Sequence, residues 1–457
     1  MGIVVSASLT ARDPHPNRRI WRIAAPAIAA NISGPLVGVV DTWALGHLPD
    51  PAYLAAIAVG AFIFHFVYWS FGFLRMGTTG LVAQAHGAGD EARLLRIVLR
   101  SVVLGLGFAG AVLVLQTPIL HGLFALLNPE AMEAELALRY CLIRIWAAPA
   151  ILLRVTVIGY LVGIQRTRLA LLIELMLNLG NAALTVYLVN VLGFGMEGAA
   201  VASLAAEVVA AALAVFVAMR LLGGPALLLA AKDRAFWHLS AFAKLMSVNG
   251  FIFMRTLFLL LAFALLWRNS AALGSTVLST NQVLIQFLML TSFGLDGIAY
   301  AAEALVGMAV GRHDQAALRQ MVRLTTLWAL ALAVLYSVIF WIAGEAIIRS
   351  FTDIAQIRAL AMGFLHWLIV MPVIAVWSYQ FDGIFIGATK TAAMMWTMIL
   401  AFAVYAVALL VLVPRFGNHG LWGAMMIFLA LRGLGLALCY PWLVRNRIGE
   451  APGKIGP

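Results

Sequence analysis

Charged residues are scarce in this chain of 457 amino acids. Asp, Glu, Lys and Arg together make up 11% of it, whereas hydrophobic residues make up 64%. A soluble protein of this length needs far more charge on its surface. The scarcity excludes a soluble globular protein and indicates a chain that crosses a membrane several times.

Cysteine and the common enzyme motifs are also scarce. The two cysteines, Cys141 and Cys439, lie in apolar segments, which is typical of small core residues rather than of a disulfide or a metal site. The chain has no Walker A loop, no HExxH, no GxSxG and no CxxC pair. We therefore expect neither an enzyme nor a cofactor nor a metal site, and an ion gradient rather than ATP as the energy source.

Basic residues outnumber acidic ones, and the formal net charge is +11. They lie mostly in short links between apolar segments, so they indicate membrane topology rather than a nucleic-acid surface. If the N-terminus is cytoplasmic, the links on the opposite side hold only Arg268, Arg349, Arg358 and Arg415. This bias predicts an even number of spans with both termini in the cytoplasm.

Apolar segments broken by Gly, Pro and charge predict about twelve membrane-spanning helices. They cover about 20–48, 53–84, 98–124, 134–163, 168–191, 196–221, 237–267, 273–309, 317–344, 356–386, 390–413 and 419–444. A more polar link at 222–236 separates the sixth helix from the seventh.

Segments of the first half of the chain recur in the second half. The distance along the sequence between corresponding residues is constant, and it equals the distance from Gly80 to Ala304. Gly80–Val98 resembles Ala304–Val322 in eight positions, and Ile158–Thr167 resembles Asp382–Thr391 in two glycines and a threonine. Two independent matches at the same offset indicate a duplication. Since each half has six spans, both halves keep the same orientation, an arrangement typical of transporters with the site between the halves.

We thus predict an all-α polytopic membrane protein of two parallel six-helix bundles related by pseudo-two-fold symmetry. The first bundle is expected at 1–224, a cytoplasmic linker at 225–236 and the second bundle at 237–457.

The first span contains a single carboxylate, Asp41, and two prolines, Pro26 and Pro35. A carboxylate inside a membrane is costly and usually faces a protein interior, where it binds an ion, a proton or a substrate. Each proline leaves a carbonyl unpaired, so the helix can bend. An acid on a bendable helix is what an ion-coupled carrier needs, although a purely structural Asp is the alternative.

The fifth span carries a polar stripe. Glu174, Asn178, Asn181 and Thr185 are separated by four, three and four residues and share one helix face. In the sixth span, Ser203 and Glu207 also share a face. If these faces meet the first span, Asp41 gains amide and hydroxyl neighbours that suit either a proton or Na⁺.

The second half has its own polar groups, namely Arg255, Asp296, Glu303 and Asp382. Arg255 needs an acidic partner, and Glu303 or Asp296 is expected to supply it. A structural ion-pair network and a transport role both stay open. We expect most other arginines in or near spans to extend to the membrane interface; these are Arg75, Arg139, Arg144, Arg154 and Arg432.

Several segments together resemble the multidrug and toxic compound extrusion (MATE) family, in particular its DinF-like branch. The resemblance extends from Trp21 to Leu443. It is carried by APAIAANISGPLVGVVDTWALG, FLRMGTTGLVAQAHGAGD, GLDGIAYAAEALVG and FDGIFIGATKT in this order.

The resemblance implies a two-lobed exporter of organic compounds, often cationic drugs, that exchanges them for H⁺ or Na⁺. It assigns the coupling acid to Asp41, the helix bend to Pro26 and polar partners to Asn181 and Ser203. Thr185 departs from the pattern, because the branch often has an Asp there. The departure favours a single-proton site over a two-carboxylate Na⁺ site.

We therefore predict a multidrug-type antiporter of the inner membrane, working as a monomer among lipids, with a small organic substrate, a coupling ion and no nucleic-acid partner. Two alternatives on the same scaffold are a flippase for a lipid-linked precursor and an exporter of organic anions, both favoured by arginines within spans.

Overall fold

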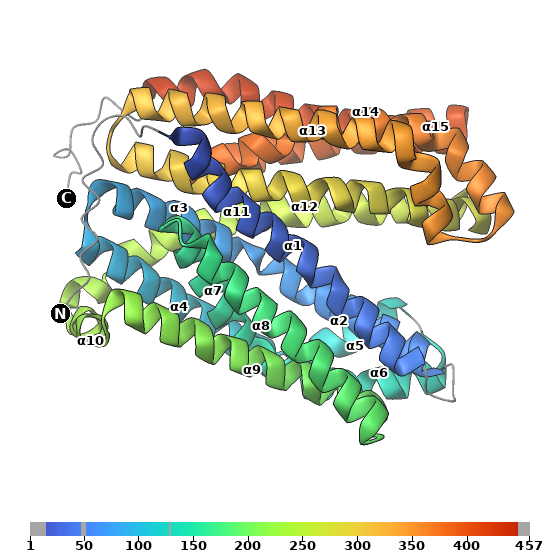
Figure 1. The fold of residues 1–457 in the computed structure, drawn as a ribbon, viewed down its shortest axis with the longest axis horizontal. Helices are drawn as coiled ribbons and strands as arrows, with labels where there is room; N and C mark the ends of the chain where they lie inside the picture. The colour runs from blue at the N-terminus through green and yellow to red at the C-terminus, as the bar shows by residue number, and fades with distance from the viewer. Residues whose placement is uncertain (1–14, 47–51, 128, 447–457) are drawn as a thin grey trace. The chain divides into compact units, whose positions relative to one another are not determined.

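The computed structural model describes residues 15–46, 52–127 and 129–446, and these residues form helices and no strands (Figure 1). Eleven described helices are long and apolar enough to cross a membrane. The last of them, α15, joins two helices at a kink, so it contains both the eleventh and the twelfth predicted spans. The all-α polytopic prediction is confirmed. The predicted end of the first span, at 48, lies outside the described residues.

The chain divides into two compact units. Unit 1 contains Ala29–Met246, and unit 2 contains the start of α1, through Ile28, and the chain from Ser247 onward. The division therefore falls inside α1, shortly after Pro26. The lobe boundaries predicted from the sequence stay a prediction.

Unit 1 contains the later part of α1 (Pro16–Gly46) and nine further α-helices, with shorter segments between them. The helices are α2 (Ala52–Ser70), α3 (Gly72–Ala88), α4 (Glu91–Val114), α5 (Gln116–Leu127), α6 (Ala131–Arg144), α7 (Ala148–Gly163), α8 (Thr167–Thr185), α9 (Gly195–Leu222) and α10 (Gly224–Lys232). The shorter segments are η1 (Ile145–Ala147), η2 (Val186–Val191) and η3 (Arg234–Trp237).

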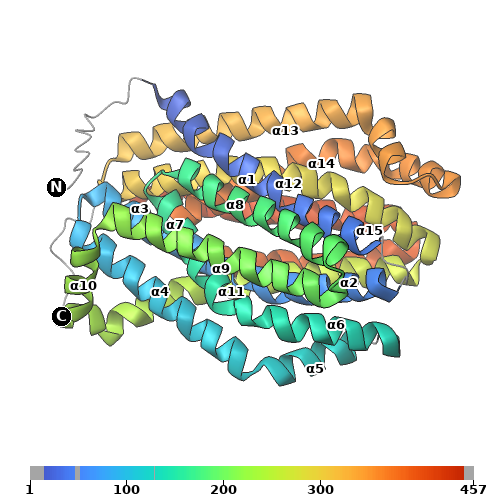
Figure 2. The same ribbon diagram turned by 60° about the horizontal axis from the view of Figure 1, so that its bottom comes forward.

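Three predicted spans of unit 1 are divided in the structure. The second span becomes α2 and α3, the third becomes α4 and α5, and the fourth becomes α6 and α7. The turn of the chain from α4 into α5 is visible in Figure 2. Hydropathy alone does not reveal such breaks, because apolar residues continue through them.

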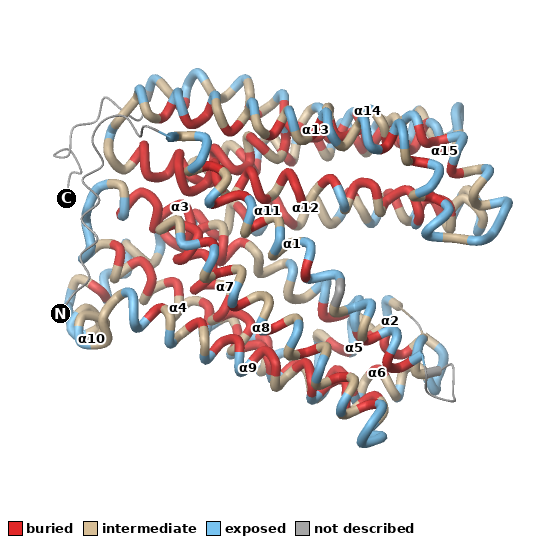
Figure 3. Tube along the Cα trace, viewed as in Figure 1, coloured by how far each residue is buried: buried red, intermediate tan, exposed pale blue. Residues whose placement is uncertain are grey.

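Unit 2 contains the first part of α1 and five long helices. These are α11 (Leu239–Ala272), which belongs to this unit from Ser247 onward, α12 (Ser275–Gly311), α13 (Gln315–Phe351), α14 (Ala355–Gly387) and α15 (Thr391–Asn446). Ile20, Ile23 and Ala24 of α1 pack in a buried cluster with residues of α12 and α13. Burial is especially dense along α12 (Figure 3).

The duplication seen in the sequence is repeated in the backbone. Between α3 and α4, Gly89 has a φ of 70°, and Asp90 caps α4 by accepting a hydrogen bond from the Arg93 amide. At the corresponding turn between α12 and α13, His313 has a φ of 56° and Asp314 caps α13 in the same way. The turn geometry is therefore kept even where glycine is not.

The interhelical contacts are repeated as well. A Cβ atom added to Gly159 of α7 would lie 2.6 Å from the Arg75 carbonyl oxygen of α3, and one added to Gly383 of α14 would lie 2.6 Å from the Ala299 carbonyl oxygen of α12. Only glycine allows this backbone approach. The matching glycines of the sequence repeat thus mark matching helix crossings.

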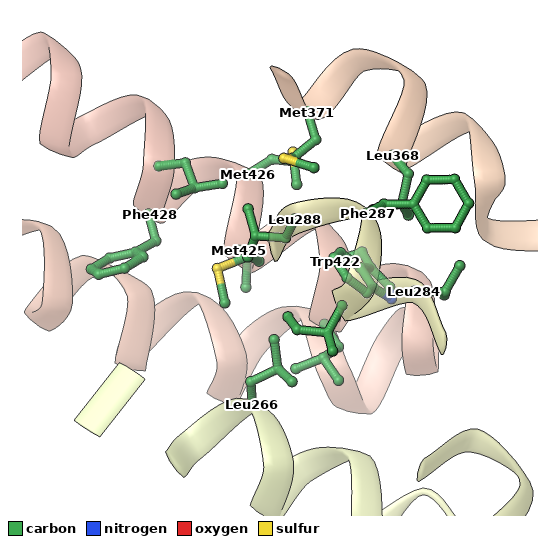
Figure 4. Close-up of a cluster of buried hydrophobic side chains, with 14 of the residues drawn as sticks. Leu266, Leu284, Phe287, Leu288, Leu368, Met371, Trp422, Met425, Met426 and Phe428 are labelled. Atoms are coloured by element: carbon green, nitrogen blue, oxygen red, sulfur yellow. The ribbon is translucent and has the colours of Figure 1, made fainter. Parts of the chain in front are cut away.

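The centre of unit 2 is a hydrophobic core between α12, α14 and α15. Phe287, Leu368, Met371 and Trp422 converge there (Figure 4). The core includes a satisfied polar group, since the Asn281 amide contacts Asn418, Ser270 and Trp422. Asn418 follows Gly417, the non-helical residue of α15, so this network fixes the kink.

Candidate functional site

Asp41 is buried in unit 1, with 6% of its surface exposed. The Thr185 hydroxyl of α8 donates a hydrogen bond to the Asp41 carboxylate at 3.1 Å. Within the described part of the chain, no Arg or Lys side chain forms an ion pair with Asp41. Asp41 is therefore a buried carboxylate held by a neutral donor.

The polar stripe of α8 faces other helices, as the sequence predicted. Besides the Thr185 contact, Asn178 donates a hydrogen bond to the Ser33 hydroxyl of α1 at 2.7 Å. Asn190, which lies in the π-helical turn η2, donates to the Ala44 carbonyl at 3.0 Å. Sequence analysis missed Asn190 because its spacing of five from Thr185 fits a π-turn and not the ordinary helical period.

Asn181 joins α8 to α9. Its amide nitrogen donates to the Ser203 hydroxyl at 2.9 Å, and both residues are buried. The Asn181 carbonyl oxygen, Oδ1, is buried and has no hydrogen-bond partner among the described residues. Such an atom is costly unless something donates to it.

Arg144, at the end of α6, is a site residue that sequence analysis assigned to the membrane interface. It instead donates a hydrogen bond to the Tyr140 hydroxyl, and its guanidinium lies 5.0 Å from the centre of the Phe64 ring. It also lies within electrostatic range of Asp41 and Glu207. The available signal was its position near the middle of a span, where extension to the interface is difficult.

Arg154 also departs from the interface prediction. Its guanidinium contacts Glu174 of α8 at 2.5 Å and Glu207 of α9 at 2.9 and 3.3 Å. The three side chains form a largely buried ion-pair cluster that joins α7, α8 and α9. Glu174 and Glu207 are therefore engaged by a structural cation in this arrangement.

In unit 2 the acidic partner of Arg255 is Asp382, so the expectation of Glu303 or Asp296 was wrong. Asp382 also contacts Arg432 at 3.0 Å, and all three residues are buried. Arg432 thus does not reach the interface either. Helix spacing gives the face of a residue but not the rotation of the neighbouring helix, so it could not choose between the three acids.

Asp296 and Glu303 lie on α12, where Glu303 is buried. Asp296 and Asp382 are both within electrostatic range of the Tyr379 hydroxyl. Arg255, Asp296 and Asp382 are therefore close to one polar cluster.

Pro26 and Pro35 both lie within the helical range of α1, Pro26 partly exposed and Pro35 exposed. Their role in bending stays a prediction.

No group of three or more metal-ligating side chains occurs in the ranges that the structure describes. The Thr185 hydroxyl contacts Asp41 directly, whereas Asn181 and Ser203 contact each other.

Comparison with known proteins places this arrangement in a family. The MatE family model matches residues 26–188 and again residues 250–412, which repeats the offset of the sequence duplication. The chain is 38% identical to DNA damage-inducible protein F of Escherichia coli (strain K12), over 97% of this chain and 95% of that protein. It is 23% identical to the probable multidrug resistance protein NorM of Pseudomonas syringae pv. tomato, over 97% of this chain and all of that protein.

Solved structures agree on the fold. A multidrug resistance MATE family transporter of the MOP superfamily, in an outward-facing conformation, superposes with a TM-score of 0.85 at 19% identity, covering 95% of this chain and 97% of that one. Together with the two family-model matches, these similarities are decisive: the chain belongs to the MatE family.

Proposed function

We propose that this protein is a secondary antiporter that exports organic compounds across the inner membrane in exchange for H⁺. In this proposal Asp41 is the coupling acid, both termini are cytoplasmic, and the protein works as a monomer in the lipid bilayer. The observation that carries it is the buried Asp41 carboxylate, which has a neutral hydroxyl donor and no ion-pair partner among the described residues. Such a carboxylate can be neutralised by a proton or by a cationic group of a substrate.

Exchange requires that proton and substrate compete for Asp41 and favour different conformations. The division of α1 supports such a difference, because the helix packs with unit 2 up to Ile28 and with unit 1 from Ala29. Pro26 shortly precedes this change of partners. A change in the charge of Asp41 therefore acts on α1, the helix whose two parts belong to different units.

H⁺ is favoured over Na⁺ because Thr185 stands where the DinF-like branch often has a second acid. A Na⁺ site needs several oxygen ligands, and one carboxylate with a hydroxyl that donates to it offers less negative charge than two carboxylates. Na⁺ coupling is the second choice.

The flippase alternative loses part of its support. It depended on arginines within the spans, yet Arg154, Arg255 and Arg432 each contact a carboxylate. Paired guanidinium groups of this kind do not form an open basic groove for a lipid phosphate.

The test is proton release by the purified protein when candidate substrates are added, with Na⁺ or K⁺ in the buffer. We expect release by the wild type, none by Asp41→Asn, and no effect of Na⁺. Asp353→Asn is the control, because Asp353 is an exposed acid that pairs with Arg358. Release that persists in Asp41→Asn would refute the assignment of the coupling acid, and substrate affinity that follows Na⁺ would refute H⁺ coupling.

A further inference from the structure

A groove with a volume of about 410 Å³ lies between α14 and α15 of unit 2. Ile374, Trp377 and Phe381 of α14 line one side of it, and Ala430 and Leu434 of α15 line the other. Trp377 is 40% exposed and Leu434 is 54% exposed, so the groove is open along its outer side. Both helices are long and apolar enough to cross a membrane, so lipid chains are the apolar molecules that reach this opening.

The groove owes its shape to the pairing of large side chains with small ones. A Cβ atom added to Gly433 of α15 would lie 2.6 Å from the Trp377 Cβ atom of α14, so the two helices approach closely here. The rings of Trp377 and Phe381 on α14 face the small side chains of Ala430 and Ala437 on α15 across the groove. Since the lining residues extend over two turns of each helix, the hollow runs along the helices and suits an extended apolar chain.

Aromatic rings continue from the groove toward the end of α15. The centres of the Phe381 and Tyr440 rings are 6.1 Å apart, and Tyr440 lies within electrostatic range of Arg319 of α13. Two residues after Tyr440, the Trp442 ring lies 4.6 Å from the Lys390 ammonium group. Tyr and Trp are typical of the boundary between membrane and water. The groove therefore leads from the apolar part of the spans to a basic boundary region.

This end of unit 2 has an excess of positive charge. Gln315 at the start of α13 donates a hydrogen bond to the Val444 carbonyl near the end of α15 at 3.3 Å, so these two helix ends lie side by side. The described residues 312–323, 388–390 and 440–445 include one acid, Asp314, which already accepts the hydrogen bond that caps α13. The same segments contain five basic residues, namely Arg312, Arg319, Arg323, Lys390 and Arg445. Such a surplus attracts an anionic group more strongly than a neutral one.

The fold does not require the aromatic and basic residues of this region. At the offset of the duplication, Phe381 and Arg319 correspond to Val157 and Leu95 of unit 1. The turns and the glycine contacts of the two units match, although unit 1 has neither the ring nor the guanidinium at these positions. A unit of this fold can therefore be built without them.

We propose that the groove binds one acyl chain of an anionic phospholipid, whose phosphate group lies at Arg319 and Lys390. The chain contributes apolar contacts along α14 and α15, and the two basic residues contribute the preference for a negative headgroup. A zwitterionic phospholipid with the same chains fits the groove but gains less from the positive charge. The inference goes beyond the proposed function and does not depend on it, because neither substrate nor ion gradient takes part in the binding.

The first experiment counts the lipids that bind to the purified, delipidated wild type, by native mass spectrometry. The probes are dioleoylphosphatidylglycerol, dioleoylphosphatidylcholine, which has the same chains, and glycerophosphoglycerol, which has the headgroup without chains. We expect one phosphatidylglycerol to bind about tenfold more tightly than phosphatidylcholine, as two basic residues beside one phosphate predict, and glycerophosphoglycerol not to bind. Equal affinities for the two phospholipids, or binding of the headgroup alone, would overturn the proposal.

The second experiment removes the charges. In Arg319→Gln combined with Lys390→Gln, we expect phosphatidylglycerol to bind no more tightly than phosphatidylcholine does. Arg349→Gln is the matched control, because Arg349 lies at the opposite end of α13 with an exposed side chain that pairs with Glu345. It should keep the preference of the wild type. A preference that persists in the double variant would overturn the assignment of the phosphate group to these residues.

The third experiment fills the groove. Ala430→Leu should weaken the binding of both phospholipids about tenfold, because the added side chain takes the place of part of the acyl chain. Ala403→Leu is the matched control, since Ala403 is an exposed alanine of α15 that does not line the groove. Equal binding by the two leucine variants would show that the lipid lies elsewhere. If Ala430→Leu does not fold, the charge variants and the wild-type comparison still decide.

Discussion

Asp41, Arg144, Asn181 and Thr185 of unit 1 correspond, at the offset of the duplication, to Leu265, Leu368, Tyr405 and Leu409 of unit 2. Three of these four counterparts belong to the buried hydrophobic core of unit 2, and Leu265 packs against it. The turns and glycine contacts of the two units nevertheless match. The fold therefore does not require the polar cluster, because its apolar counterpart is built on an equivalent backbone.

The ionic groups of the two units also differ. In unit 1, Arg144 and Arg154 are surrounded by three acids, namely Asp41, Glu174 and Glu207. In unit 2, Asp382 contacts the two guanidinium groups of Arg255 and Arg432. A carboxylate held by a neutral donor, such as Asp41, suits a site that gains and loses a positive charge, whereas a carboxylate between two arginines is already neutralised. This difference agrees with the proposal that exchange takes place in unit 1, and it predicts a structural role for the cluster of unit 2.

The largest expected effect tests that structural role. Asp382→Asn removes the carboxylate that the buried Arg255 and Arg432 both contact, so we expect it to lower the free energy of unfolding in mixed micelles by about 3–5 kcal/mol. Replacing Arg255, Asp382 and Arg432 together by Met, Leu and Met should restore most of the loss.

Asp353→Asn is the control, since that exposed pair with Arg358 should contribute about 0–1 kcal/mol. Glu207→Gln should cost less than Asp382→Asn, because Arg154 keeps Glu174. Equal losses for the Asp382 and Asp353 variants would contradict the difference between the two units.

The next test compares substitutions at Leu409 of unit 2 and Thr185 of unit 1, which occupy corresponding positions. Leu409→Ala opens a cavity in the core of unit 2 and should lower the free energy of unfolding by about 2–5 kcal/mol. Thr185→Ala removes one hydrogen bond to Asp41, so the free energy of unfolding should fall by only about 1 kcal/mol. Its proton release on substrate addition should differ from that of the wild type. Thr185→Ser keeps the hydroxyl and should behave as the wild type. A change of proton release in Leu409→Ala alone would show that the functional division is wrong.

Much of this comparison could be predicted from the sequence. The offset follows from comparing short motifs of the two halves. The spans and the polar face of α8 follow from local patterns, because each depends on residues that are close in the chain. The partners of Arg144, Arg154 and Arg255 could not be predicted. They depend on how neighbouring helices are rotated and where spans break, and hydropathy reports neither.

A smaller effect is expected at the repeated glycines. A Cβ atom at Gly387 would lie 2.5 Å from the Glu303 carbonyl oxygen, whereas one at Gly163 would first meet the Val82 side chain at 2.8 Å. Overpacking typically costs about 1–3 kcal/mol, and Ala regains about 1 kcal/mol of helix propensity. Gly387→Ala should therefore destabilise more than Gly163→Ala in the same unfolding measurement. The reverse order would mean that α3 and α7 approach each other more rigidly than α12 and α14.

The smallest effect should be the same in both units. Asp90 and Asp314 occupy corresponding positions and accept amide hydrogen bonds of 2.8 and 2.9 Å at the starts of α4 and α13. Replacing either by Ala should cost about 1 kcal/mol of unfolding free energy, and Ser should restore most of it. Because the two caps have the same geometry, losses that differ by more than the error of the measurement would show that the surroundings of the repeated turns have diverged. Equal losses would show that the two units have diverged at their centres, where Asp41 and Leu265 occupy corresponding positions, and not at these turns.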